Sequence, residues 1–585
     1  MRALRHLNKY FLKYKFRLII GLVITIIARV FATIVPTLVG DSVDVVEQYI
    51  NNEITDIAQV KSGLIINILL IAGALFISAL FTFLMRQTFI VVSRFIEFDL
   101  KNEVFQHYEK LSLNFYKKNR TGDLMNRISE DVSRVRMYVG PAIMYSVNTI
   151  TLFVVVIGYM ISIAPELTLY TVTPLPILSV SIYKLSVAIH KRSTVVQEFL
   201  SKLTIFTQES FSGISVIKAY GLESPTQKNF TKLSDKSKDK NLDLAKVQAL
   251  FFPLMVLLIG FSNILVIYIG GKQFIDGTIQ DLGVIVEFII FVNMLTWPVA
   301  TVGWVSSIVQ QAEASQVRIN EFLSQEPEIT NTVTQKTPIT GNISFDNVSF
   351  TYDDTNITAL KNISFEIKNG ETIGIIGKTG AGKSTILDLI GRLYDVSSGE
   401  IRIDGVPIKN LNLTDLRASI GYVPQDAFLF SDSIQNNIKF GNEKATDDEV
   451  YEAAKNAVVH KNIIGFSKGY DTVLGERGIT LSGGQKQRVS IARAILKNPS
   501  VLLFDDCLSA VDTETEEEIL NNLHKISKNK TTFIVSHRVS TAKNANKIIV
   551  LEDGEIIQQG THNQLISTEG YYKDLYLKQL SEKEI

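Results

Sequence analysis

The segment Ile373–Thr385, with the sequence IGIIGKTGAGKST, decides the fold of the second half of the chain. Its first residues have the apolar pattern of a buried strand, and an apolar helix pattern begins at Ile386. Between them the residues fit G-x-x-x-x-G-K-[ST], a loop whose backbone N–H groups wrap phosphates at a helix N-terminus. We therefore predict a nucleotide-phosphate site formed by Gly377, Lys378, Thr379, Gly380, Ala381, Gly382, Lys383, Ser384 and Thr385.

Two side chains of this loop have predicted ligands. Lys383 is expected to reach the β- and γ-phosphates, and the Ser384 hydroxyl is expected to bind Mg²⁺. Further along the chain, the apolar strand Val501–Phe504 ends in Asp505 and Asp506. A carboxylate at the carboxyl end of a strand can hold Mg²⁺ directly or through water, so we predict that Asp505 joins Ser384 at the metal.

A second glycine-containing motif lies between these two strands. It is the pentapeptide LSGGQ, formed by Leu481, Ser482, Gly483, Gly484 and Gln485. Ser482 and the glycine amides can form an anion site, because they open a helix whose apolar face begins at Val489. The positive end of that helix would point at the anion.

Together the phosphate loop, the LSGGQ motif and the Phe-Asp-Asp strand end resemble the nucleotide-binding domain of ATP-binding cassette (ABC) transporters. The LSGGQ motif is highly specific to that family. Taken singly, Tyr352 could be a half-buried strand residue and His537 a core histidine. Other matches follow in the family's order: Tyr352 for stacking on adenine, Gln425 in the loop that links the Mg²⁺ site to the membrane domain, Glu476–Gly478 for contact with intracellular loops, Asp512 in the dimer-contact loop Ser509–Asp512, and His537 near the γ-phosphate.

This resemblance implies ATP and Mg²⁺ as cofactors and assigns the catalytic roles. Lys383 and Mg²⁺ would stabilise charge on the transferred phosphoryl group, His537 would contact the γ-phosphate, and Gln425 would help to order Mg²⁺ and water. A carboxylate after the Mg²⁺ aspartate would position or deprotonate the attacking water. In the family this residue is normally Glu, whereas here it is Asp506.

The composition of the chain indicates a membrane protein with a large soluble part. The chain has 585 residues, of which 46% are hydrophobic and 20% charged, and its mean hydropathy is +0.18. These values exclude a disordered, fibrous or disulfide-stapled protein. The formal net charge of +0 gives no indication of nucleic-acid binding. Cys507 is the one cysteine, so no intrachain disulfide can form and the functional parts are expected in a reducing compartment.

The first half contains six apolar segments, and a bilayer core needs about 20 apolar residues in a helix. The N-terminal segment is too long for a secretory signal and is interpreted as the first span. Lys and Arg gather in the N-terminus and in the two long connecting segments, which the positive-inside rule places in the cytoplasm together with the nucleotide-binding domain. The predicted spans in the plasma (inner) membrane are Leu18–Asp41, Gly63–Phe83, Ala142–Ile163, Leu167–Ile189, Phe251–Gly271 and Leu282–Val305.

We therefore predict an all-α membrane domain of six helices with long cytoplasmic extensions, followed by an α/β P-loop NTPase domain. The expected boundaries are 1–325 for the membrane domain, 326–342 for a polar linker and 343–585 for the nucleotide-binding domain. Phe95–Leu111 and Val195–Ile217 keep helical apolar spacing beyond the membrane. The resemblance implies short coupling helices near Phe115–Tyr116 and close to Gly213.

The resemblance covers nearly the whole chain and implies an exporter half-transporter of the multidrug and lipid-flippase kind. Such a protein would move amphipathic small molecules, drugs or lipids, and each ATP would lie between the phosphate loop of one subunit and the LSGGQ motif of the other. Because Asp506 is shorter than Glu, a heterodimer with a second half-transporter is favoured over a homodimer. An ATP-gated or regulatory membrane protein that hydrolyses little ATP remains the alternative.

Charged residues in or near the predicted spans include Arg29, Arg86 and Glu287, at positions where charges are costly and often functional. Arg29 is near the middle of the first span, and Glu287 is near the outer end of the sixth. Both are candidates for a substrate cavity. Glu287 could instead extend to the membrane interface.

Overall fold

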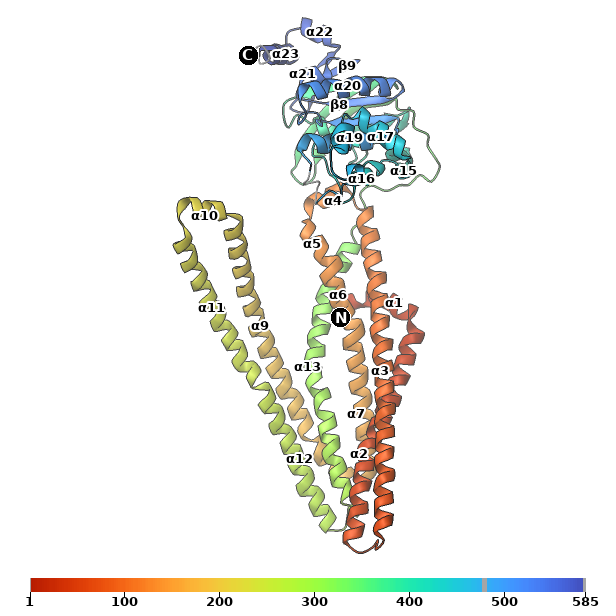
Figure 1. Ribbon diagram of the computed structural model, residues 1–585, viewed down its shortest axis with the longest axis vertical. Coiled ribbons are helices and arrows are strands. Elements are labelled where there is room, and N and C mark those ends of the chain that lie inside the picture. The colour runs from red at the N-terminus through yellow and green to blue at the C-terminus, as the bar shows by residue number, and fades with distance from the viewer. Residues whose placement is uncertain (1, 476–480, 582–585) are drawn as a thin grey trace. The chain divides into compact units, whose positions relative to one another are not determined.

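The computed structural model describes residues 2–475 and 481–581. The chain divides into two compact units, a helical unit made of Met1–His107 with Gly122–Ser324 and an α/β unit made of Tyr108–Thr121 with Gln325–Ile585. The two units are drawn in Figure 1, and each is described by itself below. The predicted contact segment Glu476–Gly478 lies outside the described residues.

The helical unit is built of long helices, as the apolar spacing of the first half predicts. Helices α5, α6 and α7 follow one another through two short π-helical stretches, and α11 is followed directly by α12. The elements are η1 (Ala3–Leu7), α1 (Asn8–Lys13), α2 (Lys15–Ile50), α3 (Ile57–Lys110), α5 (Thr121–Asn126), η2 (Arg127–Asp131), α6 (Val132–Met137), η3 (Tyr138–Ala142), α7 (Ile143–Ile163), α8 (Pro165–Val172), α9 (Pro174–Ser212), α10 (Ile214–Tyr220), α11 (Glu223–Ala249), α12 (Phe251–Ile275) and α13 (Gly283–Leu323).

Five helical stretches of the described residues are long and apolar enough to cross a membrane. They contain five of the six predicted spans, and the prediction of a helical membrane domain is confirmed. The fourth predicted span, Leu167–Ile189, is instead divided between α8 and α9 at Thr173. Pro174 follows this break, and a proline has no backbone N–H with which to continue a helix. The count of six spans therefore stays a prediction. The five stretches are Lys15–Ile50, Ile57–Lys110, Thr121–Ile163, Glu223–Ile275 and Gly283–Leu323.

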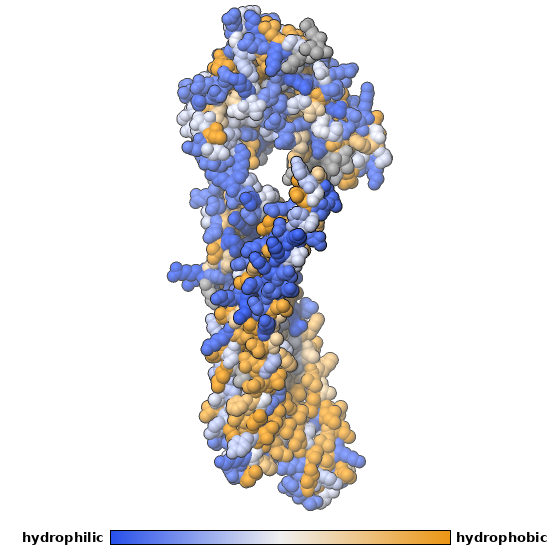
Figure 2. Space-filling view, turned by 90° about the vertical axis from the view of Figure 1, so that its left-hand side faces the viewer, coloured by the Kyte–Doolittle hydropathy of each residue, from blue (hydrophilic) through white to orange (hydrophobic). Residues whose placement is uncertain are grey.

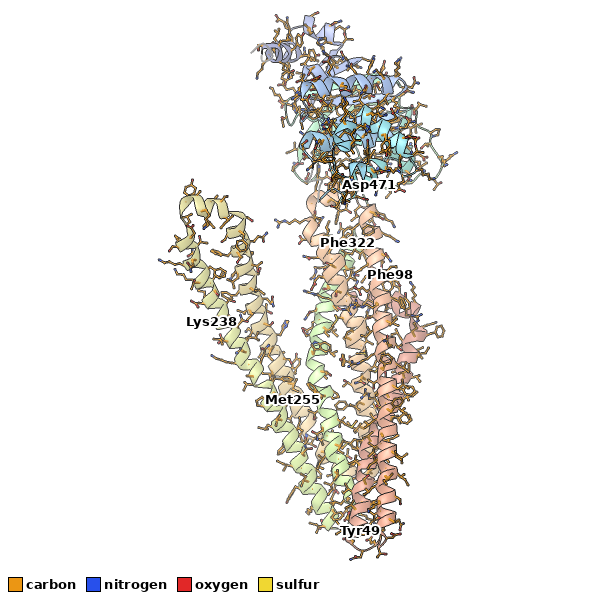
Figure 3. All side chains as sticks on the ribbon, viewed as in Figure 1. Tyr49, Phe98, Lys238, Met255, Phe322 and Asp471 are labelled. Atoms are coloured by element: carbon orange, nitrogen blue, oxygen red, sulfur yellow. The ribbon has the colours of Figure 1, made fainter. Side chains whose placement is uncertain are left out.

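Much of the apolar surface of the helical unit is exposed, as expected for side chains that face lipid. Figure 2 shows apolar side chains gathered over one stretch of the helices. The exposed apolar residues of this unit include Ile66, Leu69 and Phe76 on α3. Figure 3 shows the change of character along one arm, where Lys238 lies on the charged helix α11 and Met255 on the apolar helix α12.

The α/β unit contains two sheets, which confirms the α/β class predicted for the second half. One sheet is antiparallel with the order β2-β1-β4-β5, and the other has the order β10-β9-β3-β8-β7-β6. Its strands are β1 (Ile343–Tyr352), β2 (Ile357–Ile367), β3 (Thr372–Gly377), β4 (Ser398–Ile403), β5 (Val406–Pro407), β6 (Ile420–Val423), β7 (Val501–Asp505), β8 (Thr531–Val535), β9 (Lys547–Glu552) and β10 (Glu555–Gly560).

Helices of the α/β unit cover the sheets or extend from them. The first of these, α4 (Leu113–Lys118), comes from the segment Tyr108–Thr121. Short helices α4 and α10 thus occur at both places where coupling helices are expected. The helices are α4, α14 (Lys383–Ile390), η4 (Ile408–Asn410), α15 (Leu413–Ala418), α16 (Ile434–Lys439), α17 (Asp447–Asn456), α18 (His460–Ile464), η5 (Gly469–Asp471), α19 (Gly483–Leu496), α20 (Thr513–Ile526), η7 (Ser527–Asn529), α21 (Val539–Ala542), α22 (His562–Ser567) and α23 (Tyr571–Ser581).

The strand order of the second sheet positions the candidate site. Strands β9, β3, β8, β7 and β6 are parallel neighbours, so their carboxyl ends lie along one edge. The phosphate loop follows β3, His537 follows β8, Asp505 ends β7, and Gln425 follows β6. Four motifs that are far apart in the sequence therefore meet at one edge, where ligands bind in open α/β sheets.

Candidate functional site

The phosphate loop has the backbone that its glycines predict. Gly382 has a φ of 94°, in the left-handed region that favours glycine, and directly precedes α14. Lys383 is only 6% exposed. Its Nζ donates to the carbonyl oxygens of Gly377 at 2.9 Å and Lys378 at 2.8 Å. Burial lowers the pKa of the Lys383 ammonium below its ordinary value, while the nearby Asp506 and Asp505 oppose that shift.

The predicted metal-binding oxygens lie side by side. Ser384 Oγ donates to Asp505 Oδ1 at 2.9 Å, although the two residues are 121 positions apart in the sequence. The Asp505 side chain is buried, and desolvation raises its pKa. A hydroxyl and a carboxylate fit Mg²⁺, which prefers oxygen ligands and uses few of them from the protein beside phosphates and water.

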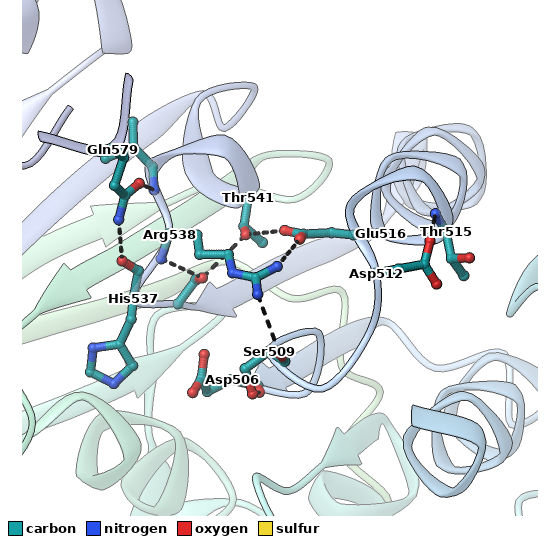
Figure 4. A network of polar contacts seen from close by, with 11 residues as sticks. Asp506, Ser509, Asp512, Thr515, Glu516, His537, Arg538, Thr541 and Gln579 are labelled. Carbon is teal, nitrogen blue, oxygen red and sulfur yellow. Dashed lines mark hydrogen bonds and ion pairs between the residues drawn. The ribbon is translucent and has the colours of Figure 1, made fainter. Parts of the chain in front are cut away.

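Asp506 and His537 also come together in this site. The backbone N–H of His537 donates to the Asp506 carboxylate, and burial raises the pKa of that carboxyl above its ordinary value. Asp506 has a φ of 42°, a left-handed conformation that Asp tolerates better than most residues. Figure 4 shows both residues in the network that follows β7 and β8.

Gln425 is placed differently from Ser384 and Asp505. Its side chain is exposed, and it makes no hydrogen bond to either residue within the described part of the chain. The Gln425 carbonyl oxygen instead accepts a hydrogen bond from Nε2 of Gln487, a buried residue of α19. Sequence reasoning missed Gln487, although its place directly after LSGGQ on one helix face is a signal that could have identified it.

The LSGGQ motif begins helix α19 through a capping box. Ser482 Oγ accepts from the Gln485 N–H at 3.3 Å, and the Ser482 N–H donates to Gln485 Oε1 at 3.0 Å. Leu481 is buried, whereas Ser482 and Gly483 are exposed. No hydrogen bond joins the motif to the phosphate loop of the same chain in the ranges that are described. The tip of the motif, Ser482 with Gly483, is therefore exposed on the surface of the α/β unit.

The loop Ser509–Asp512 lies close to this motif. A Cβ atom on Gly484 would lie 2.7 Å from the carbonyl oxygen of Ala510, so only glycine permits this approach. Asp512 is the N-cap of α20 and accepts from the Thr515 N–H at 2.9 Å. These hydrogen bonds from Thr515 lower the pKa of Asp512.

Tyr352, at the end of β1, is held beside the phosphate loop. Its hydroxyl lies 2.9 Å from Thr385 Oγ1, and burial raises its pKa. Lys117 of α4 places its Nζ 4.6 Å from the centre of the Tyr352 ring and 5.0 Å from that of Tyr394. Sequence reasoning also missed this contact, since nothing local in the sequence links α4 to β1.

The two charged membrane candidates have different surroundings in the helical unit. Glu287 is buried at 4% exposure, and Thr37 Oγ1 of α2 donates to its Oε1 at 2.5 Å. The same Thr37 hydroxyl lies 3.0 Å from the Tyr159 hydroxyl of α7. Glu287 thus packs against neighbouring helices of the unit. Arg29 is half-buried, and its Nε has no partner among the described residues.

Comparisons with known proteins agree with this geometry. Residues 18–299 match the model of the ABC transporter transmembrane region, and residues 360–509 match the model of the ABC transporter family. One relative is the probable multidrug resistance ABC transporter ATP-binding/permease protein YheI of Bacillus subtilis, which is 36% identical. The match covers 99% of this chain and 97% of that protein.

Further relatives extend the comparison. Multidrug resistance-like ATP-binding protein MdlA of Escherichia coli is 37% identical over 83% of this chain and 82% of its own length. The ATP-dependent lipid A-core flippase of Syntrophus aciditrophicus is 35% identical over 83% of this chain and 81% of its own length. The solved structure of a bacterial Atm1-family ABC exporter with ATP bound has a TM-score of 0.77 and 27% identity, and each chain is covered over 98%. The chain therefore belongs to the ABC transporter family, as an ATP-hydrolysing exporter of the plasma membrane whose transmembrane region and ATP-binding domain are fused in one polypeptide.

Proposed function

We propose that this chain is one half of a dimeric exporter that uses ATP hydrolysis to move amphipathic small molecules, drugs or lipids by alternating access. The observation that carries the proposal is the 2.9 Å hydrogen bond between Ser384 and Asp505, beside the buried Lys383. It joins a phosphate-binding loop to a carboxylate suited to Mg²⁺. The substrate class is supported by relatives whose names describe multidrug resistance and lipid A-core flipping.

The proposed roles follow from the positions of the side chains. Phosphates bind in the loop Gly377–Thr385 and on Lys383, and adenine stacks on Tyr352. Ser384 and Asp505 hold Mg²⁺, with Gln425 contributing when nucleotide is bound, and Mg²⁺ supplies charge stabilisation to the transferred phosphoryl group. His537 contacts the γ-phosphate. Asp506 orients the attacking water.

We also propose that the bound ATP joins two half-transporters. The exposed tip of LSGGQ at Ser482 and Gly483 is available to a second subunit, and it does not bond to its own phosphate loop within the described residues. ATP then binds the closed pair better than the open one, and this difference in affinity drives closure. Asp506 favours a heterodimer whose second chain carries Glu at this position.

The proposed membrane domain comprises 1–325 with six spans, followed by the linker 326–342 and the nucleotide-binding domain 343–585. The fourth span is assigned to α8 with the start of α9, because this segment is apolar and its two helices are separated by Thr173 alone. Arg29 and Glu287 are proposed to face the substrate cavity. Glu287 is buried against Thr37 in the helical unit, which fits an inward-facing position.

The test is transport into inside-out vesicles with a panel of fluorescent drugs and labelled lipids. We expect ATP-dependent uptake that Lys383→Ala abolishes and that Lys368→Ala, an exposed lysine outside the site, leaves unchanged. The absence of transport despite normal ATP binding, with or without a co-expressed half-transporter, would contradict the proposal. If the purified chain alone hydrolyses ATP briskly and Asp506→Asn abolishes this activity, the heterodimer is wrong.

A second function class is an ATP-gated or regulatory membrane protein. The specific observation in its favour is Asp506, whose shorter side chain is expected to slow hydrolysis. The two classes differ in whether hydrolysis is needed. Uptake that requires hydrolysis supports an exporter, whereas a response that AMP-PNP supports as well as ATP supports the gated protein.

A further inference from the structure

The side chain of Gln579, on the C-terminal helix α23, pairs with the backbone of the segment that carries His537. Its Nε2 donates to the His537 carbonyl oxygen at 2.9 Å, and its Oε1 accepts from the Val539 N–H at 2.8 Å. The two partners flank Arg538 in the sequence, and Figure 4 shows the Gln579 side chain beside this segment. One carboxamide therefore satisfies two backbone groups just after β8, where the strand ladder has ended.

The same segment is held from its other side by α20. Arg538 donates from Nη1 to Glu516 Oε2 at 2.7 Å and from Nη2 to the Ser509 carbonyl oxygen at 3.4 Å. Glu516 is only 2% exposed and also accepts from the Thr541 hydroxyl. The His537 ring itself makes no hydrogen bond within the described residues (Figure 4). The backbone of His537 is thus fixed from two directions while its imidazole stays available for a ligand.

Helix α23 is firmly attached and can serve as a support. Tyr572 is fully buried in a cluster that includes Val539 and Ile376, the residue before the phosphate loop. The Tyr572 hydroxyl lies 2.7 Å from His562 Nδ1, and the Tyr572 N–H donates to Gln558 at 3.0 Å. A helix anchored on the strands beside the phosphate loop can hold a catalytic segment at a fixed distance from it.

We infer that Gln579 is a positioning residue for His537: its paired hydrogen bonds hold the backbone so that the imidazole meets the γ-phosphate. This inference rests on the proposed contact of His537 with the γ-phosphate. Loss of both hydrogen bonds lets the segment relax toward other backbone conformations. The population of the competent conformation is therefore expected to fall by roughly a factor of ten.

The test measures recognition of the γ-phosphate by the full-length chain in lipid nanodiscs. The readout is the ratio of the dissociation constant for MgADP to that for MgAMP-PNP, which needs no turnover. Gln579→Met keeps the length of the side chain and removes both hydrogen bonds. Gln579→Glu keeps the acceptor for Val539 and removes the donor to His537. Lys578→Met is the matched control, since Lys578 is the exposed neighbour on the same helix.

We expect His537→Ala to lower the ratio about tenfold or more, because it removes a hydrogen bond to a charged phosphate. Gln579→Met and Gln579→Glu are expected to lower it about threefold to tenfold, and Lys578→Met to leave it unchanged. In the His537→Ala background, Gln579→Met is expected to have no further effect, which a loss of general stability would not reproduce.

The outcomes separate the inference from the proposal on which it rests. If His537→Ala leaves the ratio unchanged, the proposed role of His537 is wrong and the inference is lost with it. If His537→Ala lowers the ratio but both Gln579 variants do not, only the inference is overturned. Additive effects of His537→Ala and Gln579→Met would also overturn it, because Gln579 would then act by another route.

Discussion

Lengthening the carboxylate at position 506 by one methylene is expected to raise ATP turnover. Asp506 is 9% exposed, and its carboxylate accepts from the backbone N–H of His537. Its short side chain stops about 1.5 Å before the position that a Glu carboxylate would reach. A misplacement of about 1 Å can reduce the rate roughly 10²-fold, so Asp506→Glu is expected to raise kcat by about 10- to 100-fold.

A stability penalty is expected to accompany this gain. Asp506 has a left-handed backbone with φ 42°, which Asp adopts more easily than Glu. The substitution is therefore expected to destabilise the nucleotide-binding domain by about 1 kcal/mol. The KM for ATP should change little, because the proposed role of this side chain is to orient the attacking water and not to bind the nucleotide.

The assay is phosphate release over a range of ATP concentrations, with the chain in nanodiscs and Asp506→Asn as the matched control without charge. We expect kcat to be highest for Asp506→Glu, lower for the wild type and lowest for Asp506→Asn. If Asp506→Glu binds ATP with wild-type affinity and melts as a folded protein, yet turns over no faster than wild type, the reach of this carboxylate does not limit hydrolysis. The argument for a heterodimer would then fail, because it depends on slow hydrolysis at the short Asp506 side chain.

Three further substitutions test the surroundings of the site. Ser384→Ala removes the hydroxyl that lies 2.9 Å from the Asp505 carboxylate. Calorimetry is expected to show that MgATP binds roughly tenfold more weakly, whereas binding of ATP in EDTA changes little. Lys117→Met removes the ammonium 4.6 Å from the Tyr352 ring, and a loss of about 1 kcal/mol is expected as a lower melting temperature. Burial raises the pKa of Asp388 from 3.8 to about 6, so its charged form opposes folding above that pH. Asp388→Asn is therefore expected to raise the free energy of unfolding near pH 7.5 by up to about 3 kcal/mol, which would be seen as a higher melting temperature. This gain should fade as the pH falls toward 4.

The parts of the site that the sequence predicted are those in which local pattern and topology agree. The strand–loop–helix around Lys383 follows from hydrophobic period and glycine spacing alone. The meeting of Ser384 and Asp505 then follows from one rule, that carboxyl ends of neighbouring parallel strands share an edge. The family resemblance added Tyr352 and His537. Tyr352 reaches the phosphate loop from β1 of the antiparallel sheet, and His537 lies just after the end of β8 in the other sheet.

The missed features depend on contacts between distant segments. Gln487, Gln579 and Lys117 each bind a backbone or ring that is far away in the sequence, and no spacing rule links the two ends of such a contact. The sequence left Glu287 with two alternatives, a substrate cavity or the membrane interface, because its contact with Thr37 on a distant helix could not be predicted. The interruption at Thr173 was not predicted, because a membrane helix can tolerate prolines such as Pro174 where neighbouring helices satisfy the freed carbonyl oxygens.

Two further contacts place the loop Ser509–Asp512 between elements that serve different nucleotide sites in the proposed dimer. The Ser509 carbonyl oxygen accepts from Arg538, whose backbone neighbour is His537, so one end of the loop Ser509–Asp512 is joined to the segment that is proposed to meet the γ-phosphate. At Ala510 the same loop lies against Gly484 of the LSGGQ motif, with no room for a Cβ atom. A partner that displaces this loop must therefore move Arg538 or α19, because packed elements do not deform continuously. In the proposed dimer, the motif on α19 serves the ATP of the partner and His537 serves the ATP of its own loop. In that proposed dimer, the loop Ser509–Asp512 would be a direct structural connection between the two sites.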